Sequence, residues 1–200
     1  MYQRKDRFYR RAKEAGLRSR AAFKLEDLDR QLLRGGDRVL DLGCWPGGWL
    51  QVAAQRVGER GRVVGVDLRV LDPIGLGNVR VIQGDVAAES TLGEIDHALD
   101  GRADVVLSDM SPPLTGVRDR DEARTSEIVR LAFRVAERML RPGGSFVCKV
   151  FMNSEYAALR DEISARFADV QATRSQATRR GSAELYLIAR GFRPDALSAS

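Results

Sequence analysis

The chain has 200 residues and a formal net charge of +5; 44% of its residues are hydrophobic and 30% are charged. This length and balance predict one soluble globular domain, spanning residues 1–200, with a single substantial core. No apolar run approaches the length of a membrane span, which argues against a membrane protein. The N-terminus lacks the apolar segment of a signal peptide, so we expect a cytoplasmic protein.

Two cysteines and one histidine limit the possible chemistry. Cys44 and Cys148 lie in apolar contexts and are expected to be reduced, as is typical of a cytoplasmic protein. His97 lies in a polar helical context, which argues against a metal site or a general base built from histidine. We therefore expect no metal.

Basic residues are concentrated at the N-terminus. Residues 1–24 hold nine lysines and arginines and two acids, a net charge of +7, so the remainder of the chain is slightly acidic. Aromatic residues are interleaved with these cations, at Tyr2, Phe8, Tyr9 and Phe23, and a weaker basic cluster follows at Arg174, Arg179 and Arg180. This pattern predicts that residues 1–24 bind nucleic acid. A solvated tail or a transit peptide are the alternatives.

Taken in chain order, the hydrophobic pattern alternates between helices and strands. It predicts a helix over 17–32, a strand over 37–43, a helix over 47–58 stopped by Gly58, strands over 61–67 and 79–85, a helix over 90–99, a strand over 103–109, a helix over 121–140, a strand over 145–151, a helix over 154–167 and strands over 169–174 and 183–190. Ser90 or Thr91 is expected to cap the helix over 90–99. The sequence "RPGG" is expected to close the helix over 121–140. The alternation predicts an α/β fold with a doubly wound, mostly parallel seven-stranded sheet and helices on both faces.

Sheets of this kind bind ligands beyond the carboxyl ends of their strands, so the strand ends are informative. The first strand runs into a turn with Gly43, Gly47 and Gly48, where the backbone can approach a ligand closely at a helix N-terminus. The spacing is not that of the dinucleotide fingerprint. Asp41, just before the turn, suits a ligand that carries an ammonium group.

Acids also follow the next three strands. Asp67 is placed to accept hydrogen bonds from ribose hydroxyls, Asp85 can accept from an adenine amino group, and Asp109 ends the fourth strand. Each acid alone could be a helix cap or a turn former. Together with the glycine turn they predict a nucleoside site with an amino-acid tail, which is the chemistry of S-adenosylmethionine. Trp49 could pack on this ligand or in the core.

One lysine interrupts an apolar run. Lys149 lies in "SFVCKVF", which otherwise predicts a strand buried on both faces, where an unpaired charge is costly. The fourth and fifth strands are expected to be neighbours, so Asp109 and Lys149 should lie side by side. Otherwise, the lysine stem could be buried with its amine reaching solvent.

Between residues 16 and 190 the sequence resembles the FtsJ/RlmE family of ribosomal RNA 2′-O-methyltransferases. The blocks that carry the resemblance are "GLRSRAAFKL", "DLGCWPGGW", "DPIGLGNVRVIQGD", "LSDMSPPLTG" and "RPGGSFVCKVF". The resemblance implies the S-adenosylmethionine-dependent class I methyltransferase fold and a catalytic tetrad of Lys24, Asp109, Lys149 and Glu184. It implies cofactor contacts from Gly47, Trp49, Asp67, Asp85 and Asp109, and as substrate a uridine of large-subunit ribosomal RNA. The chain departs from the family pattern at Cys44–Trp45 and at Pro113.

The expected reaction is in-line attack of a ribose 2′-hydroxyl on the sulfonium methyl group. We assign the general base to Lys149: burial, Lys24 and the sulfonium favour the neutral amine, whereas Asp109 and Glu184 favour the ammonium and act as orienting groups. Lys24 would steady the developing oxyanion or a phosphate. In the alternative, Lys149 stays protonated and only positions the hydroxyl.

Other functions remain open at this point. The substrate could be transfer RNA or an mRNA cap, the chain could be a ribosome-assembly protein with vestigial catalysis, or it could methylate a small molecule. The basic N-terminal segment disfavours the small molecule. We expect a monomer that acts on the large ribosomal subunit and contacts no membrane.

Overall fold

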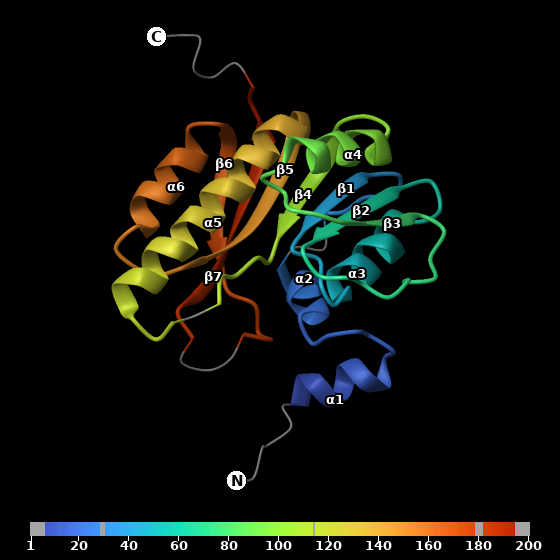
Figure 1. Cartoon of the computed structure of the whole chain (residues 1–200), viewed down its shortest axis with the longest axis horizontal. Helices are drawn as coiled ribbons and strands as arrows, with labels where there is room; N and C mark the ends of the chain where they lie inside the picture. Colours follow the sequence, from blue (N-terminus) through green and yellow to red (C-terminus); the bar gives the residue numbers. More distant parts are fainter. Residues whose placement is uncertain (1–6, 29–30, 114, 179–181, 195–200) are drawn as a thin grey trace.

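The computed structural model describes residues 7–28, 31–113, 115–178 and 182–194, and these form an α/β fold around one seven-stranded sheet (Figure 1). The strands lie in the order β3-β2-β1-β4-β5-β7-β6. Their bounds are β1 Arg38–Leu42, β2 Arg62–Asp67, β3 Val79–Gln83, β4 Ala103–Ser108, β5 Leu140–Phe151, β6 Phe167–Thr173 and β7 Glu184–Phe192. β7 pairs antiparallel with both of its neighbours, and the pairs from β3 to β5 are parallel. The predicted fold class is confirmed.

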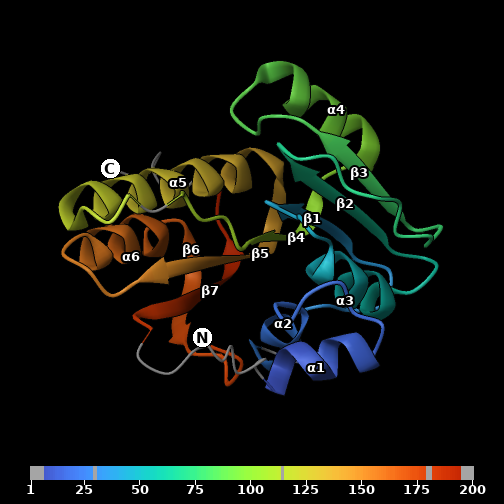
Figure 2. The same ribbon diagram turned by 60° about the horizontal axis from the view of Figure 1, so that its bottom comes forward.

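Helices cover both faces of the sheet (Figure 2). Their bounds are α1 Arg7–Glu14, α2 Ala22–Leu28, α3 Gly48–Val57, α4 Glu89–Leu99, α5 Arg118–Met139 and α6 Tyr156–Ser164. α4, α5 and α6 pack with one face of the sheet in one core cluster, and α2 and α3 pack with the other face in a second cluster. Among the described residues, no helix is long and apolar enough to cross a membrane.

The alternation of side chains along β5 decides which face Lys149 occupies. Phe146 and Cys148 are buried on the face covered by α5 and α6, whereas Val147 is buried on the face covered by α2 and α3. Because successive strand side chains point to opposite faces, Lys149 shares the face of Val147. α2 carries Lys24 on that same side, so the topology brings the two lysines to one region.

Several predicted boundaries were wrong. α4 begins at Glu89 with Ala88 at its N-cap, so neither Ser90 nor Thr91 caps it. Thr91 instead lies buried against Gly84, where an added Cβ would come within 2.6 Å of its Oγ1. The predicted helix over 17–32 is shorter, because α2 starts at Ala22.

The sequence "RPGG" does not close a helix into a loop. Leu140, after the last residue of α5, is already extended, and β5 begins there. The pairing of β4 with β5 shifts from Ala103–Leu140 to Val105–Ser145, so the two glycines form an irregularity inside the strand. Gly143, at φ +77°, adopts the left-handed conformation that this requires.

Candidate active site

A cavity of about 450 Å³ lies at the carboxyl ends of β1 to β4. Its polar wall contains three predicted site carboxylates, Asp67, Asp85 and Asp109. Asp67 ends β2, Asp85 follows β3, and Asp109 comes directly after β4, so the parallel register brings acids from three strands to one edge of the sheet. The remaining lining includes Gly43, Trp45, Val66, Leu68, Arg69, Met110 and Pro113.

The turn between β1 and α3 requires glycine at two positions. Gly43 has φ +75°, and a Cβ added there would lie 2.5 Å from Cγ of Met110 in the cavity wall. Gly47 has φ +105°, and its Cβ would lie 2.8 Å from Cδ1 of Ile74. A side chain at either position would therefore strain the backbone and displace a neighbour.

Two predicted cofactor-contact residues do not line this cavity, namely Gly47 and Trp49. The Trp49 side chain is buried in the core, donates a hydrogen bond from Nε1 to the Ala21 carbonyl at 2.7 Å, and packs 5.8 Å from the Tyr186 ring. Of the two roles expected for the Trp49 side chain, the geometry therefore favours packing in the core over packing on the ligand. The main chain of both residues still lies at the turn and the N-terminus of α3.

Two of the three cavity carboxylates, Asp67 and Asp85, are fixed by main-chain donors. Asp67 accepts from the Trp45 amide at 3.0 Å on Oδ2 and from the Arg69 amide at 2.9 Å on Oδ1. Asp85 accepts from the Ala87 amide at 2.9 Å. A carboxylate has about four acceptor positions, so each group keeps capacity for a ligand after these bonds form.

Asp41 lies deeper than we expected. It is a buried residue of β1, and its Oδ2 has no hydrogen-bond partner in the described part of the chain. Burial raises the pKa of Asp41 well above its usual range, and the negative charges of Asp109 and Asp67 raise it further. These effects favour the neutral acid, which makes Asp41 a poor direct partner for an ammonium group.

Lys149 and Asp109 form a close pair, as the adjacency of β4 and β5 predicted. Nζ of Lys149 donates to the main-chain oxygen of Asp109 at 2.6 Å and lies 3.1 Å from its Oδ1. The lysine side chain is 8% exposed, so its amine does not simply extend into solvent. Asp109 also lines the cavity, and it therefore connects the cavity to the lysine.

A second pair lies beside the first. Nζ of Lys24 is 2.6 Å from Oε1 of Glu184, and their side chains are 9% and 14% exposed. Thr178 donates a further hydrogen bond to the same glutamate oxygen at 3.2 Å. The four side chains predicted to act together therefore lie in two ion pairs at the same end of the sheet, each with a buried lysine and a partly buried carboxylate.

Tyr186 joins the two pairs, and sequence reasoning did not identify it. Its hydroxyl donates to Oδ1 of Asp109 at 2.7 Å and accepts from Nζ of Lys24 at 3.1 Å. Burial and the charges of Asp109 and Glu184 raise the pKa of Tyr186, which keeps the hydroxyl as a donor. Tyr186 pairs directly with Lys149 across β5 and β7 and lies two positions after Glu184, so strand periodicity was a usable signal.

A gain in stability does not by itself account for these charges, because removing ions from water is costly and apolar replacements are often as stable. Their arrangement gives the site a chemical capability. It presents two amines and two carboxylates, connected by one hydroxyl, next to a cavity of acidic character. Such a site can hold a cationic nucleoside ligand and accept or donate a proton beside it.

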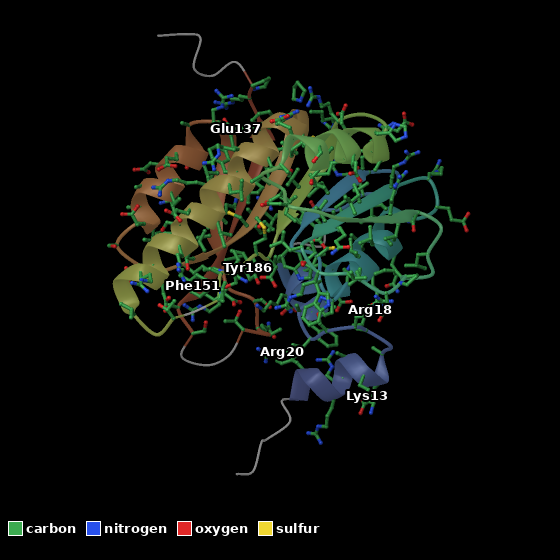
Figure 3. All side chains as sticks on the ribbon, in the orientation of Figure 1. Lys13, Arg18, Arg20, Glu137, Phe151 and Tyr186 are labelled. Atoms are coloured by element: carbon green, nitrogen blue, oxygen red, sulfur yellow. The ribbon has the colours of Figure 1, made fainter. Side chains whose placement is uncertain are left out.

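The basic N-terminal residues have different roles. Arg11 stacks over the Phe23 ring at 4.8 Å, and Arg18 donates to the carbonyls of Asp72 and Pro73 at 2.6 and 2.5 Å, so both help to hold the structure together. Arg10 and Lys13 are exposed on α1. In the view of Figure 3, Arg20 and Lys13 lie below Tyr186, with Lys13 on α1. The predicted contributions of Tyr2, Arg179 and Arg180 lie outside the described residues.

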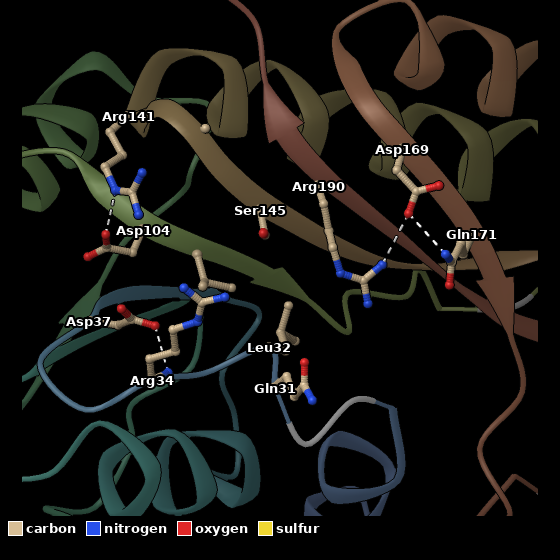
Figure 4. Close-up of a pocket in the computed structure, with 12 residues that line it drawn as sticks. Gln31, Leu32, Arg34, Asp37, Asp104, Arg141, Ser145, Asp169, Gln171 and Arg190 are labelled. Atoms are coloured by element: carbon tan, nitrogen blue, oxygen red, sulfur yellow. Dashed lines mark hydrogen bonds and ion pairs between the residues drawn. The ribbon is translucent and has the colours of Figure 1, made fainter.

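A second cavity, of about 390 Å³, lies near the amino ends of β4 and β5 (Figure 4). Two of its arginines are paired with acids: Arg141 with Asp104 at 2.5 Å and Arg190 with Asp169 at 3.4 Å. Ligands of parallel sheets bind at the opposite end of the strands. The candidate active site is therefore the cavity at Asp109.

Comparison with known proteins agrees with this geometry. The model of the family described as FtsJ-like methyltransferase matches residues 17–192. The chain is 47% identical over 194 residues to a ribosomal RNA large subunit methyltransferase E of Anaeromyxobacter dehalogenans, covering 96% of this chain and 73% of that protein. A protein of the same name from Methanothrix thermoacetophila is 47% identical over 186 residues, covering 92% and 71%.

A solved structure is also similar. A chain from Plasmodium falciparum, titled as a ribosomal RNA methyltransferase, superposes with a TM-score of 0.76 at 28% sequence identity, covering 88% of this chain and 98% of that chain. A Clostridium thermocellum chain titled as an rRNA methylase shares the fold at a TM-score of 0.53 and 17% identity.

Proposed function

Because the chain belongs to the FtsJ-like methyltransferase family, we propose that it methylates the ribose 2′-hydroxyl of a uridine in large-subunit ribosomal RNA. As a member of this family, the chain is a methyltransferase that uses S-adenosylmethionine. The observation that carries the proposal is that Asp109 takes part in both features of the site: it lines the cavity and it also binds Lys149. A ligand in the cavity would thus lie next to the amine.

The residues of the cavity fit this cofactor. A volume of about 450 Å³ is within the range of cofactor sites. Asp67 and Asp85 keep acceptor capacity for ribose hydroxyls and an adenine amine, and the acidic wall suits a positive sulfonium. Gly47 and Trp49 would make their contacts through the main chain, because the Trp49 side chain is turned into the core.

S-adenosylmethionine, when bound, supplies a methyl group on a sulfonium that departs as a neutral thioether, so the protein need not provide an acid. What the protein must provide is alignment and removal of the hydroxyl proton. We assign that proton to Nζ of Lys149. The two oxygens of Asp109 occupy two hydrogen-bonding positions of the amine and leave the third for the ribose hydroxyl. After the transfer, the carboxylate of Asp109 stabilises the ammonium.

Lys24 would act on the oxygen of the substrate. Its ammonium has three donors, and two of them are directed at Glu184 and the Tyr186 hydroxyl. The third donor is available to steady the developing oxyanion or a phosphate. Glu184 holds Lys24 in place, which is the orienting role expected for it. The exposed cations of α1 would bind the phosphates of the RNA backbone, and such contacts do not depend on the RNA sequence.

Mapping the modified nucleotide tests this function directly. The protein is incubated with isotopically labelled S-adenosylmethionine and, in parallel, with undermethylated large ribosomal subunits, free ribosomal RNA and transfer RNA. We expect a labelled 2′-O-methyl group on a uridine of the ribosomal RNA, and no label with a Lys149→Met variant. Label on transfer RNA alone would contradict the substrate proposal. A Lys149→Met variant that retains full methylation would contradict the proposed chemistry.

The comparison of subunits with free RNA also tests the assembly state of the substrate. We propose that the chain acts as a cytoplasmic monomer on the large subunit; the names of its relatives support large-subunit ribosomal RNA as the substrate. Faster methylation of free ribosomal RNA than of subunits would contradict this part of the proposal.

A further inference from the structure

Trp45 is an exposed aromatic side chain at the rim of the cavity. It is 47% exposed, whereas the other tryptophan of the chain, Trp49, is 3% exposed. Large aromatic side chains are mostly buried, because their exposure to water is unfavourable. Trp45 is also one of the residues that line the cavity of Asp67, Asp85 and Asp109. Its exposed surface therefore lies where a ligand could cover it.

The position of Trp45 is set by Asp67. One carboxylate oxygen of Asp67 accepts from the Trp45 amide at 3.0 Å, and the other accepts from the Arg69 amide at 2.9 Å. The guanidinium of Arg69 in turn lies over the Trp45 ring, with Cζ 4.6 Å from the ring centroid. A cation at this distance from an indole face is attracted to it. The three residues thus form one assembled wall, and Arg69 also lines the cavity.

We infer that Trp45 is a cofactor-binding residue whose indole packs on the nucleoside part of S-adenosylmethionine, with Arg69 supporting the ring from its other side. The carboxylate that would hold the ribose is the same group that fixes the tryptophan amide. A nucleoside whose ribose binds Asp67 would therefore lie close to the main chain of Trp45, in the cavity that the Trp45 side chain also lines. Binding removes exposed indole surface from water, which adds to the affinity without a new polar contact.

An RNA base is the competing occupant, since exposed aromatic rings can also stack on bases. Three observations favour the cofactor. Trp45 lines the acidic cavity, its amide is bonded to an acid of that cavity, and the negative wall formed by Asp67, Asp85 and Asp109 would repel a phosphate backbone. The exposed cations of α1 lie in another part of the chain, on the helix that precedes α2.

Titration with S-adenosylhomocysteine in a calorimeter tests the inference. Trp45→Ala should weaken binding by roughly 5- to 20-fold, the effect of losing one aromatic packing contact, and Trp45→Phe should lie between this variant and the unsubstituted protein. The matched control is Leu76→Ala, which removes another exposed apolar side chain that does not line this cavity. Its affinity should remain within twofold. Thermal unfolding of each variant verifies that the exposed substitution leaves the fold intact.

Tryptophan fluorescence gives an independent readout. Adding S-adenosylhomocysteine should shift or quench the emission of the unsubstituted protein, and Trp45→Phe, which retains only Trp49, should lose most of this signal. The inference is overturned if Trp45→Ala binds S-adenosylhomocysteine within twofold of the unsubstituted protein, or if it loses only RNA affinity. Failure of the unsubstituted protein to bind S-adenosylhomocysteine would contradict the cofactor assignment itself, so the two failures are distinguishable.

Discussion

Lys149 is held by two oxygens of a single residue, the main-chain oxygen of Asp109 at 2.6 Å and its Oδ1 at 3.1 Å. This double contact fixes the direction of the amine from the adjacent strand end. It also couples the amine to the cavity, because Asp109 belongs to both. The lysine that interrupts an apolar strand is thus positioned by the backbone and the side chain of its neighbour.

Asp109→Asn should weaken both cofactor binding and methyl transfer. The main-chain contact to Lys149 remains, but the charge that would stabilise the ammonium is lost. Loss of a charge-assisted hydrogen bond costs about 1.5–3 kcal/mol, which corresponds to about 10- to 150-fold in kcat/KM. The measurement is steady-state methylation with Asp100→Asn as control, since Asp100 is an exposed carboxylate just before the amino end of β4, whereas Asp109 follows the carboxyl end of that strand. Equal kcat/KM for the two variants would rule out this role for Asp109.

Tyr186→Phe should have a smaller effect. The phenylalanine ring preserves the packing against Trp49, and the lost hydroxyl leaves both ion pairs with a charged partner. We expect the free energy of unfolding to fall by about 1 kcal/mol and the methylation rate to fall less than tenfold. Denaturant titration and initial rates measure the two effects, with Tyr156→Phe as the matched control. A loss as large as that of Asp109→Asn would show that the hydroxyl, and not the ion pairs, holds the site.

The mostly parallel seven-stranded sheet, the adjacency of its fourth and fifth strands and the pairing of Lys149 with Asp109 could be predicted, because parallel α/β topology leaves few arrangements and puts strand ends at one edge. Strand periodicity could place Tyr186 on the same face as Glu184, but it could not predict the contacts of the Tyr186 hydroxyl. In "AELYLIAR" the tyrosine has the pattern of a core residue, and only the antiparallel register of β5 with β7 places its hydroxyl between the two pairs. That register depends on tertiary packing.

Local signals were less reliable at helix ends. Neither of the residues proposed to cap α4 lies at its N-cap, and one of them, Thr91, packs against the turn at Gly84 instead. "RPGG" has the composition of a helix stop, yet pairing with β4 draws it into the strand. In both cases tertiary contacts decided between conformations that the local sequence allows.

Asp41→Asn should change how stability depends on pH. Burial raises the pKa of Asp41 in the folded protein, so the folded state keeps a proton that the unfolded chain, with a pKa of about 3.9, has released. The unfolded state then binds fewer protons, and the free energy of unfolding falls as the pH rises above about 4. Asparagine does not titrate, so the Asp41→Asn variant does not undergo this decrease in the free energy of unfolding.

Chemical denaturation of both proteins between pH 4 and pH 8 measures the difference. The free energy of unfolding of Asp41→Asn relative to the unsubstituted protein should increase with pH, by at most about 1.4 kcal/mol per pH unit. A difference that stays constant, or that decreases with pH, would show that Asp41 is ionised in the folded protein.

The salt dependence of RNA binding tests the role of α1. Removing two phosphate contacts by Arg10→Gln with Lys13→Gln should make the slope of log K against log salt concentration shallower by about 1.5. The control is Arg56→Gln with Arg60→Gln, which removes the same charge from exposed positions at the end of α3 and just after it. Both pairs are measured on the same large-subunit RNA. Equal slopes for the two double variants would assign the RNA surface elsewhere.

The most direct test of the account is the pH–rate profile of methyl transfer for Lys149→Arg beside that of the unsubstituted protein, at saturating cofactor and RNA. Arginine keeps the positive charge and can position a hydroxyl, but it cannot accept a proton at these pH values. If Lys149 is the general base, the variant should lose about 100-fold or more of the rate, and the rise in rate with pH should disappear. Near-normal activity with an unchanged profile would show instead that residue 149 only positions the ribose.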